Sequence, residues 1–364
     1  MRAYPTFLTF EEGWLIISLM VVRVDLKDLL LEELEMILVS RRKERYRAKQ
    51  ILRWIYQKGA SSLEEMTTLS KVLRKELTEI FFISQLAPEK IETSEDGTRK
   101  FLFPLSDGKF IETVLIPERK HQTICISTQV GCQLKCRFCL SGKKGLVRNL
   151  KVSEIVNQIC LVKKYLGNKE ENLNLVLMGM GEPLSNYDNT LRALKIILSP
   201  WGLKFSHRKV TLSTAGLIPE MERLGKELPV NLAVSLNASN DQTRSYLMPI
   251  NKKYPLSKLL KACSRYPLPS RKRITFEYNL IKEVNDSPED AQKLIKLVKG
   301  IRCKINLIPF NPLPGVTFKR PDDETVLTFQ EILHTHDISA LIRKSRGADI
   351  HAACGQLTYQ RLKS

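Results

Sequence analysis

Residues 127–142, STQVGCQLKCRFCLSG, hold three cysteines, Cys132, Cys136 and Cys139, in a C-x3-C-x2-C pattern. Three thiolates on one loop can bind three irons of a 4Fe-4S cluster and leave the fourth iron without a protein ligand. Structural zinc normally takes four protein ligands, and no cysteine or histidine follows closely, although His121 lies upstream. The spacing therefore predicts a 4Fe-4S cluster with three cysteine ligands, and zinc is the alternative.

A second stretch, LVLMGMGEPLSN at residues 175–186, follows the cysteines after about one strand–helix–strand unit. Gly179 and Gly181 let the backbone approach a ligand closely, and Glu182 can accept a hydrogen bond from an amino group. A glycine-rich turn is a weak indicator by itself. Its order and distance relative to the three cysteines predict one shared cofactor site.

Strand and helix patterns alternate between residues 122 and 310. The expected strands are QTICISTQV (122–130), LNLVLMGM (173–180), KVTLSTA (209–215), VNLAVSL (230–236), RITFEYNL (273–280) and KINLIPF (304–310). The expected helices cover about 152–166, 187–198, 218–228, 255–266 and 287–300. Such repeats predict a parallel sheet, doubly wound or curled into a barrel, with function at the carboxyl ends of its strands.

Composition excludes several classes of protein. Eight cysteines among 364 residues are too few for a disulfide scaffold, so we expect a reducing, cytoplasmic location. The net charge of +19 indicates a polyanionic partner such as nucleic acid, and the alternative is a basic, solvated surface. The apolar run at 14–22 is shorter than the roughly 20 residues of a membrane span. We interpret it as a core-packing segment or a non-native extension, and expect no membrane contact.

The first third of the chain reads as a basic helical region followed by strands. In SRRKERYRAKQILRWIYQKG, residues 40–59, a helical face would carry Tyr46, Ile51, Trp54 and Ile55, and Gly59 would end the helix. This region either contacts RNA phosphates or presents a solvated charged face. Residues 100–117 are expected to form a hairpin with an Asp-Gly turn.

With these motifs in this order, the chain resembles the radical S-adenosylmethionine (SAM) enzymes and, among them, the RlmN/Cfr-type RNA adenine methyltransferases, with the RlmN type closer. The resemblance covers nearly all of residues 24–358. It is carried by YRAKQILRWIY, ETVLIPE, CISTQVGC, GMGEPL, VTLSTAG, AVSLNA, NLIPFNPLPG and DIHAACGQL.

The resemblance implies an α/β fold, a partial (β/α)6 radical SAM barrel with a small N-terminal helical domain. The implied divisions are an extension at 1–23, an RNA-contacting helical domain at 24–90, a β-rich connector at 91–117, the radical SAM core at 118–350 and a C-terminal segment at 351–364.

The implied activity is methylation of adenine carbon 2 in 23S rRNA, at the peptidyl transferase centre, and in tRNA anticodon loops. It would proceed through an S-methylcysteine and a covalent protein–RNA intermediate. Two SAM molecules would be used per product, with a flavodoxin- or ferredoxin-type reductant, by a monomer.

The resemblance also assigns residues. Cys354 in GADIHAACGQL (347–357) matches the methyl-accepting cysteine, Cys125 the resolving thiol and Glu112 the base, whereas without the resemblance these are two packing thiols and an exposed strand residue. Small neighbours of Cys354 suggest a mobile loop. The positions that match SAM contacts are Gly181, Glu182, Ser213, Ser235, Leu236, Asn237 and Asn311. Asn237 departs from the family, in which many relatives have histidine.

Two other functions stay open at this point. A Cfr-like enzyme would methylate carbon 8 of the same rRNA adenine, and the shared motifs do not separate it from the carbon-2 enzymes. A metal-bearing RNA-binding protein without catalysis would not depend on Cys354. Cys160, Cys263 and Cys303 match no motif and are interpreted as packing residues.

Overall fold

The computed structural model describes residues 23–167, 172–228, 230–268 and 271–358. The apolar run at 14–22 lies outside the described residues. Within them, no helix has both the length and the apolar character that crossing a membrane requires.

A ten-stranded sheet forms the centre of the molecule, in the strand order β14-β13-β12-β11-β10-β9-β6-β5-β4-β3. Seven of these strands run parallel from β6 to β14, and β3, β4 and β5 continue the sheet in antiparallel pairing. The parallel strands are β6 (Gln122–Cys125), β9 (Leu173–Leu177), β10 (Val210–Thr214), β11 (Asn231–Ser235), β12 (Ile274–Leu280), β13 (Cys303–Pro309) and β14 (Ala340–Ile342). The antiparallel strands are β3 (Lys90–Thr93), β4 (Arg99–Pro104) and β5 (Phe110–Pro117).

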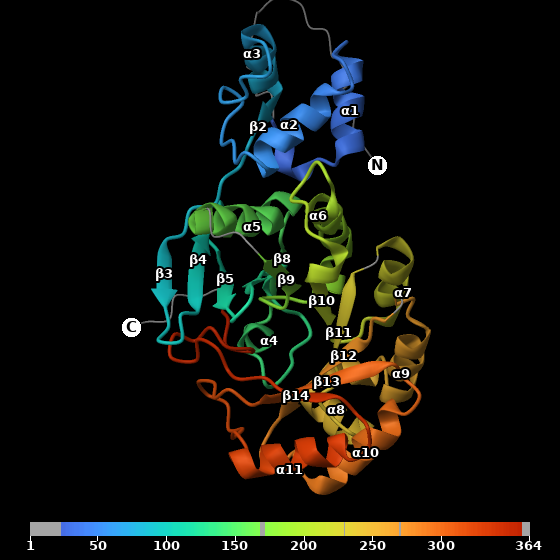
Figure 1. Ribbon diagram of the computed structural model, residues 1–364. Helices are drawn as coiled ribbons and strands as arrows, with labels where there is room; N and C mark the ends of the chain where they lie inside the picture. The colour runs from blue at the N-terminus through green and yellow to red at the C-terminus, as the bar shows by residue number, and fades with distance from the viewer. Residues whose placement is uncertain (1–22, 168–171, 229, 269–270, 359–364) are drawn as a thin grey trace, which may run out of the picture.

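Helices connect the parallel strands and cover the outer face of the curved sheet (Figure 1). They are α5 (Val152–Leu166), α6 (Tyr187–Leu198), α7 (Ile218–Glu227), α8 (Asp241–Leu247), α9 (Leu256–Arg265), α10 (Pro288–Val298) and α11 (Asp323–His334). Short 3-10 helices, η3 (Pro183–Asn186), η4 (His207–Lys209) and η5 (Pro249–Lys252), lie in the connections.

Local sequence explains where these elements begin and why they are buried. The Ser287 hydroxyl accepts a hydrogen bond from the Asp290 amide at 3.1 Å, and Pro288 opens α10, an arrangement that favours a helix start. All seven residues of β12, ITFEYNL, are buried, as expected for a β-branched and aromatic strand covered on both faces. β12 thus lies inside the parallel half of the sheet, between β11 and β13.

The N-terminal helical unit packs on α5 and α6 (Figure 1). It contains β1 (Val24–Asp25), η1 (Leu26–Asp28), α1 (Leu31–Ser40), α2 (Arg47–Tyr56), α3 (Lys71–Ile80) and β2 (Phe81–Phe82). Arg192 of α6 donates to both carboxylate oxygens of Glu33 at 2.6 Å, and the Ser153 amide donates to Asp28 at 2.7 Å. These bonds fix the helical unit to the outer layer of the barrel.

The residues after β14, 343–358, form a closing segment that passes from the β14 edge of the sheet to the β3–β5 edge (Figure 1). The Ser94 hydroxyl donates to Asp349 at 2.6 Å, and the Gly347 amide donates to Asp96 at 3.1 Å. Because β14 and β3 are the two outermost strands, this segment spans the open side of the incomplete barrel.

The predicted α/β partial barrel is confirmed, with β14 as a seventh parallel strand beyond the six expected. The expected single strand at 122–130 is wrong: β6 ends at Cys125, and β7 (Gln129–Gly131) pairs instead with β8 (Leu146–Asn149). The chain turns between β6 and β7 because the Ser127 amide donates to the Gln158 side chain and the Thr128 amide donates to the Met180 carbonyl, so neither amide continues the pairing of β6.

The helix α2 and the hairpin at 100–117 were also predicted from sequence, the first in part and the second fully. Ile51 and Ile55 of α2 are buried as predicted, but Tyr46 is half exposed because it is the residue before the helix rather than part of its apolar face. The hairpin at 100–117 forms as predicted, with Gly108 at φ +73° in its turn.

Candidate active site

A cavity of about 580 Å³ fills the interior of the barrel. Alternate residues of each strand point to the same face of a sheet, and one such set lines the cavity. The lining side chains on the parallel strands include Thr123, Cys125, Asn174, Val176, Thr211, Asn231, Ala233, Thr275, Glu277, Lys304, Asn306, Ile308 and Leu341. Most are polar, so this interior suits a ligand rather than a sealed apolar core.

The three-cysteine loop, residues 131–142, closes one side of the cavity. Cys139 lines the cavity directly. Two backbone hydrogen bonds hold the loop: the Cys132 amide donates to the Gly145 carbonyl at 3.1 Å, and the Cys139 amide donates to the Cys136 carbonyl at 3.3 Å. Burial raises the pKa of Cys132 to about 12, and burial together with the nearby Cys139 and Cys132 raises the pKa of Cys136 well above its usual value. The three thiols are therefore close neighbours in a poorly solvated place.

No three His, Cys, Asp or Glu side chains in the described ranges converge tightly enough to hold a single metal ion. Thiolates are nevertheless the ligands that iron–sulfur clusters take in proteins. The donor set of the three-cysteine loop fits such a cluster.

Cys354 and Cys125 line the same cavity. Cys125 is the last residue of β6, and Cys354 lies in the thiol loop, residues 351–357 of the closing segment. Burial raises the pKa of Cys125 to about 12, with a further contribution from Cys354, and burial raises the pKa of Cys354 to about 11. Residues 229 positions apart in sequence thus place their thiols near one another, Cys354 exposed to the cavity and Cys125 buried at its wall.

The thiol loop packs directly against the three-cysteine loop. The Leu140 amide donates to the Gly355 carbonyl and the Ser141 hydroxyl to the Leu357 carbonyl, both at 2.7 Å. Gly355 adopts φ +86°, and a side chain there would come within 2.8 Å of the Phe138 carbonyl oxygen. A glycine is therefore required next to Cys354 by the close approach of the two loops.

Glu112, the predicted base, does not line the cavity. It is buried, one carboxylate oxygen lies 3.2 Å from the Lys100 ammonium, and the other accepts the Thr358 amide at 2.7 Å. Lys100, also buried, donates to the Ile350 carbonyl at 2.6 Å and lies 3.1 Å from Glu92. This ion cluster holds both ends of the thiol loop.

Glu182 and Gly181 lie beside the three-cysteine loop at the carboxyl end of β9. The Glu182 carboxylate accepts the Ala215 amide at 2.8 Å and the Leu184 amide at 3.1 Å, and burial raises its pKa to about 7. Gly181 adopts φ +99°, and a side chain there would meet the Gln129 side chain at 2.5 Å. Both residues are thus fixed by contacts within the protein.

The other predicted SAM positions follow β10, β11 and β13. Ser213 and Ser235 occupy the same alternating positions as the cavity-lining Thr211 and Ala233. Leu236 and Asn237 are buried, and the Asn237 side chain accepts the Asn279 amide at 2.8 Å.

Asn311 is the predicted position that connects most directly to the thiols. It lines the cavity, and its side chain donates to the Cys354 carbonyl at 3.2 Å. Cys354, Cys125, Cys139 and Asn311 are therefore brought together in one cavity, whereas Glu112 lies behind the closing segment.

Two residues at the site were missed from sequence. Arg244 is fully buried and donates to the carbonyls of Ala215, Ser235 and Leu236 at 2.8–3.0 Å, which fixes the ends of β10 and β11. Glu277 lines the cavity and accepts from Asn306 at 2.9 Å, and burial raises its pKa to about 7. A carboxylate inside the apolar strand ITFEYNL is a signal that would have found Glu277.

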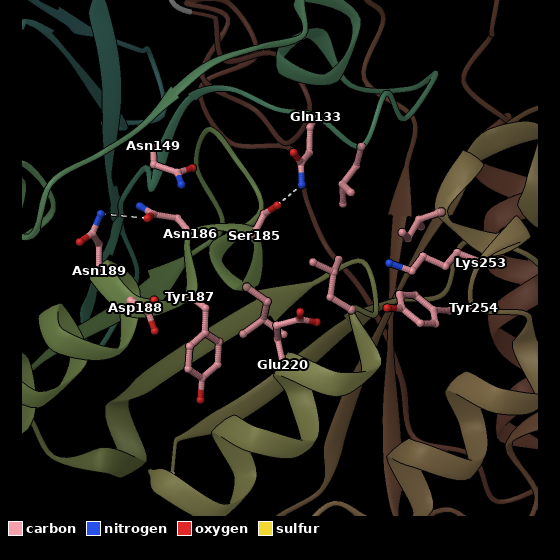
Figure 2. Close-up of a pocket in the computed structure, with 14 residues that line it drawn as sticks. Gln133, Asn149, Ser185, Asn186, Tyr187, Asp188, Asn189, Glu220, Lys253 and Tyr254 are labelled. Carbon is pink, nitrogen blue, oxygen red and sulfur yellow. Dashed lines mark hydrogen bonds between the residues drawn. The ribbon is translucent and has the colours of Figure 1, made fainter. Parts of the chain in front are cut away.

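A second cavity, of about 540 Å³, lies on the other side of the three-cysteine loop, where Gln133 faces Ser185, Glu220 and Lys253 (Figure 2). Its wall is held by Asn186, which donates to the Thr128 and Leu150 carbonyls at 2.9 Å. None of the residues predicted from sequence for the active site lines it.

Comparisons with known proteins identify the family of this chain. The family model of the ribosomal RNA large subunit methyltransferase N-terminal domain matches residues 24–83, and that of the radical SAM superfamily matches residues 126–298. The dual-specificity RNA methyltransferase RlmN of Syntrophus aciditrophicus is 54% identical over 94% of this chain and 98% of its own length. RlmN of Geobacter sulfurreducens is 54% identical over 92% of each chain.

A solved structure gives the same result for the fold. The crystal structure of a radical SAM methyltransferase from Sphaerobacter thermophilus matches with a TM-score of 0.87 and 44% identity, over 93% of this chain and all of that one. The relatives align over almost their whole length, and both family models match in the expected order. The chain therefore belongs to the RlmN family of radical SAM methyltransferases.

Proposed function

We propose that this chain methylates carbon 2 of an adenine in 23S rRNA, at the peptidyl transferase centre, and in tRNA anticodon loops. The observation that carries the proposal is the meeting of Cys354, Cys125 and Cys139 in one polar cavity. RNA as the substrate is supported by the names of the relatives, dual-specificity RNA methyltransferases, and by the net charge of +19.

The chemistry explains why two thiols are needed. Carbon 2 of adenine is electron-poor and does not attack a methyl group as a nucleophile. A carbon radical can add to it, so the methyl carbon must first be attached to the protein and then lose a hydrogen atom. Cys354 is exposed to the cavity, and in this proposal it carries that carbon.

Family membership implies a 4Fe-4S cluster and SAM, and the residues present fit both. Cys132, Cys136 and Cys139 would hold the cluster, and the ligands that would hold SAM are Gly181, Glu182, Ser213, Ser235, Leu236, Asn237 and Asn311. Together the two groups supply a methyl group and a hydrogen-abstracting radical, at a cost of two SAM per product and with electrons from a flavodoxin- or ferredoxin-type carrier. Glu182 keeps free lone pairs for an amino group although two backbone amides already bind it.

The protein's own residues then act in sequence. The Cys354 sulfur accepts a methyl group, the methyl loses one hydrogen atom, and its carbon bonds to the adenine, which joins protein and RNA. The adduct must then give up one electron, for which the implied cluster would be the acceptor, and the adenine carbon must lose its proton. The Cys125 thiolate attacks the Cys354 sulfur, the bond between that sulfur and the transferred carbon breaks, and the released carbon takes up a proton to become the methyl group. A disulfide between Cys125 and Cys354 remains. Glu112 is the proposed proton acceptor, and it must first lose its hydrogen bond to the Thr358 amide.

The test is Cys125→Ala, incubated with SAM, reductant and an RNA stem-loop. We expect a protein–RNA adduct that is stable to denaturation and joined through Cys354, because the releasing thiol is gone. Cys160→Ala, which changes a cysteine outside the cavity, should form no stable adduct. Absence of an adduct in Cys125→Ala, with turnover intact, would refute the thiol roles.

Product analysis separates the remaining alternatives. Mass spectrometry of the digested RNA should locate the new methyl on carbon 2, and a methyl on carbon 8 would indicate the Cfr-like reaction instead. Iron and sulfide analysis after anaerobic purification addresses the non-catalytic alternative, since bound zinc without sulfide would rule out the radical chemistry.

A further inference from the structure

The barrel cavity has an uneven charge distribution. Nine basic residues line it, against the two carboxylates Glu118 and Glu277. The basic residues are Arg208, Lys209, Arg271, Lys272, Arg273, Lys304, Arg343, Lys344 and Arg346. An excess of this size, far above what the two acids can neutralise, creates a strong positive potential in a partly enclosed space.

The cations that precede β10 and β12 lie at the end of the cavity opposite the thiols, whereas those at 343–346 follow the carboxyl end of β14. Lys209 immediately precedes β10 and Arg273 immediately precedes β12, so they mark the amino ends of the parallel strands. Cys125 ends β6, and Asn311 follows β13, so the reactive thiols lie at the carboxyl ends. The cavity therefore has a thiol-bearing end and a basic mouth, which we define as Arg208, Lys209, Lys272 and Arg273.

The charges of the mouth are not neutralised within the described ranges of the chain. Arg346 lies 3.8 Å from Glu118 and 3.9 Å from Asp96, and Arg343 and Lys304 face Glu277. By contrast, no carboxylate among the described residues forms an ion pair with any residue of the basic mouth, and the Lys209 ammonium donates a hydrogen bond to the neutral Asn172 side chain at 3.3 Å.

Like charges are also crowded. Burial lowers the pKa of Lys304, and Arg273, Arg343 and Lys272 lower it further, although Glu277 acts in the opposite direction. Cations that destabilise one another in this way gain from a bound anion, because the anion removes the repulsion and the cations release its counterions.

We propose that the basic mouth binds the phosphate groups on either side of the RNA base that enters the cavity. The inference rests on the proposed RNA substrate and adds the route of entry: the nucleotide passes through the amino ends of the strands toward Cys354. A base must leave its stack to reach a buried reactive atom, and phosphates held at the mouth would fix such a flipped nucleotide. Side chains that contact only phosphates position the strand without reading its sequence.

The test compares two double variants with equal charge change. Lys272→Glu with Arg273→Glu reverses two mouth charges, and Lys293→Glu with Lys296→Glu reverses two exposed charges on α10, outside the cavity. Binding of a fluorescein-labelled RNA stem-loop is measured by fluorescence anisotropy from 50 to 300 mM KCl. Iron content and thermal unfolding of each variant report whether it is folded and loaded.

We expect the mouth variant to bind RNA at least tenfold more weakly, with a salt slope lower by about 2, because each lost phosphate contact removes about one unit of the slope. The α10 variant should stay close to the unchanged protein. Equal losses in both variants would overturn the inference and leave the RNA activity standing. If instead the mouth variant slowed reduction by flavodoxin and bound RNA normally, the mouth would serve an acidic electron carrier, and the inference would also be wrong.

A second measurement does not depend on affinity. RNA with 4-thiouridine next to the target adenine is crosslinked by light, and the attached peptides are identified by mass spectrometry. Crosslinks within 208–209 or 271–273 support the inference, whereas crosslinks confined to the rim of the second cavity in Figure 2, or to 343–346 at the carboxyl ends of the strands, would contradict it.

Discussion

The two cysteine-bearing loops that meet in the cavity are held in different ways. The three-cysteine loop is fixed mainly by bonds to its own neighbours, such as the Lys143 amide on the Cys139 carbonyl at 3.0 Å. The thiol loop is fixed largely by hydrogen bonds with residues far away in sequence. Lys100 donates to the Ile350 carbonyl, Asn311 donates to the Cys354 carbonyl, and Glu112 accepts from the Thr358 amide. One loop is built locally, and the other takes its position from the assembled sheet.

The largest effect should come from breaking the local loop. Cys136→Ala removes one of three clustered thiols, and we expect loss of bound iron and sulfide together with a fall in RNA methylation of at least a thousandfold. Iron and sulfide assays and the methylation rate measure this. Cys263→Ala changes a buried cysteine outside the three-cysteine loop, and this variant should keep its iron. Full iron content in Cys136→Ala would show that the loop is not the cluster site.

Cys354→Ala should distinguish the role of the thiol loop from that of the three-cysteine loop. The change should abolish methylation as completely as Cys136→Ala, because no sulfur remains to carry the methyl carbon. Iron and sulfide should stay at the level of the unchanged protein, since the three-cysteine loop is held by its own backbone bonds. Measurable turnover in Cys354→Ala would contradict the assignment of this thiol.

Lys100→Met tests the long-range attachment of the thiol loop. The variant leaves Glu112 and Glu92 without their shared cation, and removing one partner of a buried ion pair costs about 3 kcal/mol or more. We expect faster amide hydrogen exchange across 350–358 and a roughly tenfold or greater fall in methylation, with unchanged iron.

The matched control for Lys100→Met is Lys90→Met, because Lys90 also binds Glu92, at 2.8 Å, but is mostly exposed. Exposed ion pairs contribute about 1 kcal/mol or less, so this variant should keep normal exchange and activity. Equal exchange in both variants would show that Lys100 does not fix the loop.

The smallest effect concerns pH. Burial raises the pKa of Glu277 in the folded protein to about 7, above its usual value, so the folded state holds this proton more tightly than the unfolded chain. The stability that the group contributes is present at low pH and is lost as pH rises toward 7. Glu277→Gln should therefore gain up to about 3 kcal/mol relative to the unchanged protein between pH 4.5 and 7.5. Denaturant unfolding at both pH values measures this, and an identical pH dependence in the two proteins would contradict it.

Much of the outer layer could be predicted from sequence because its signals are local. The helices at 152–166 and 187–198 have the bounds that their apolar periodicity predicted. The strand patterns located β9 to β13, since these short segments are rich in apolar and β-branched residues. By contrast, β14 was missed, because a strand of three residues carries almost no periodic signal, and the helix α11 before it was not predicted either.

The site was predicted from sequence only in part, because only some of its features depend on local sequence. The spacing of Cys132, Cys136 and Cys139 is a local property, and so is the glycine-rich turn at 179–181. Glu112 shows the limit: its sequence match is good, but its carboxylate faces Lys100 and Thr358 instead of the cavity. Nothing near Lys100 in RKFLFP indicates that this lysine would bind a carbonyl 250 residues away.

The sequence by itself determined the strand–helix order, the three-cysteine loop and the family, because these depend on spacing and short-range patterns. Only the tertiary structure decided that Cys354 and Cys125 line one cavity, that Lys100 and Glu112 hold the ends of the thiol loop, and that several cations gather at the mouth of the barrel. The physical reason is that these arrangements exist only when distant segments close the open side of the sheet. Charge and thiol chemistry then depend on which residues share one small, partly desolvated space.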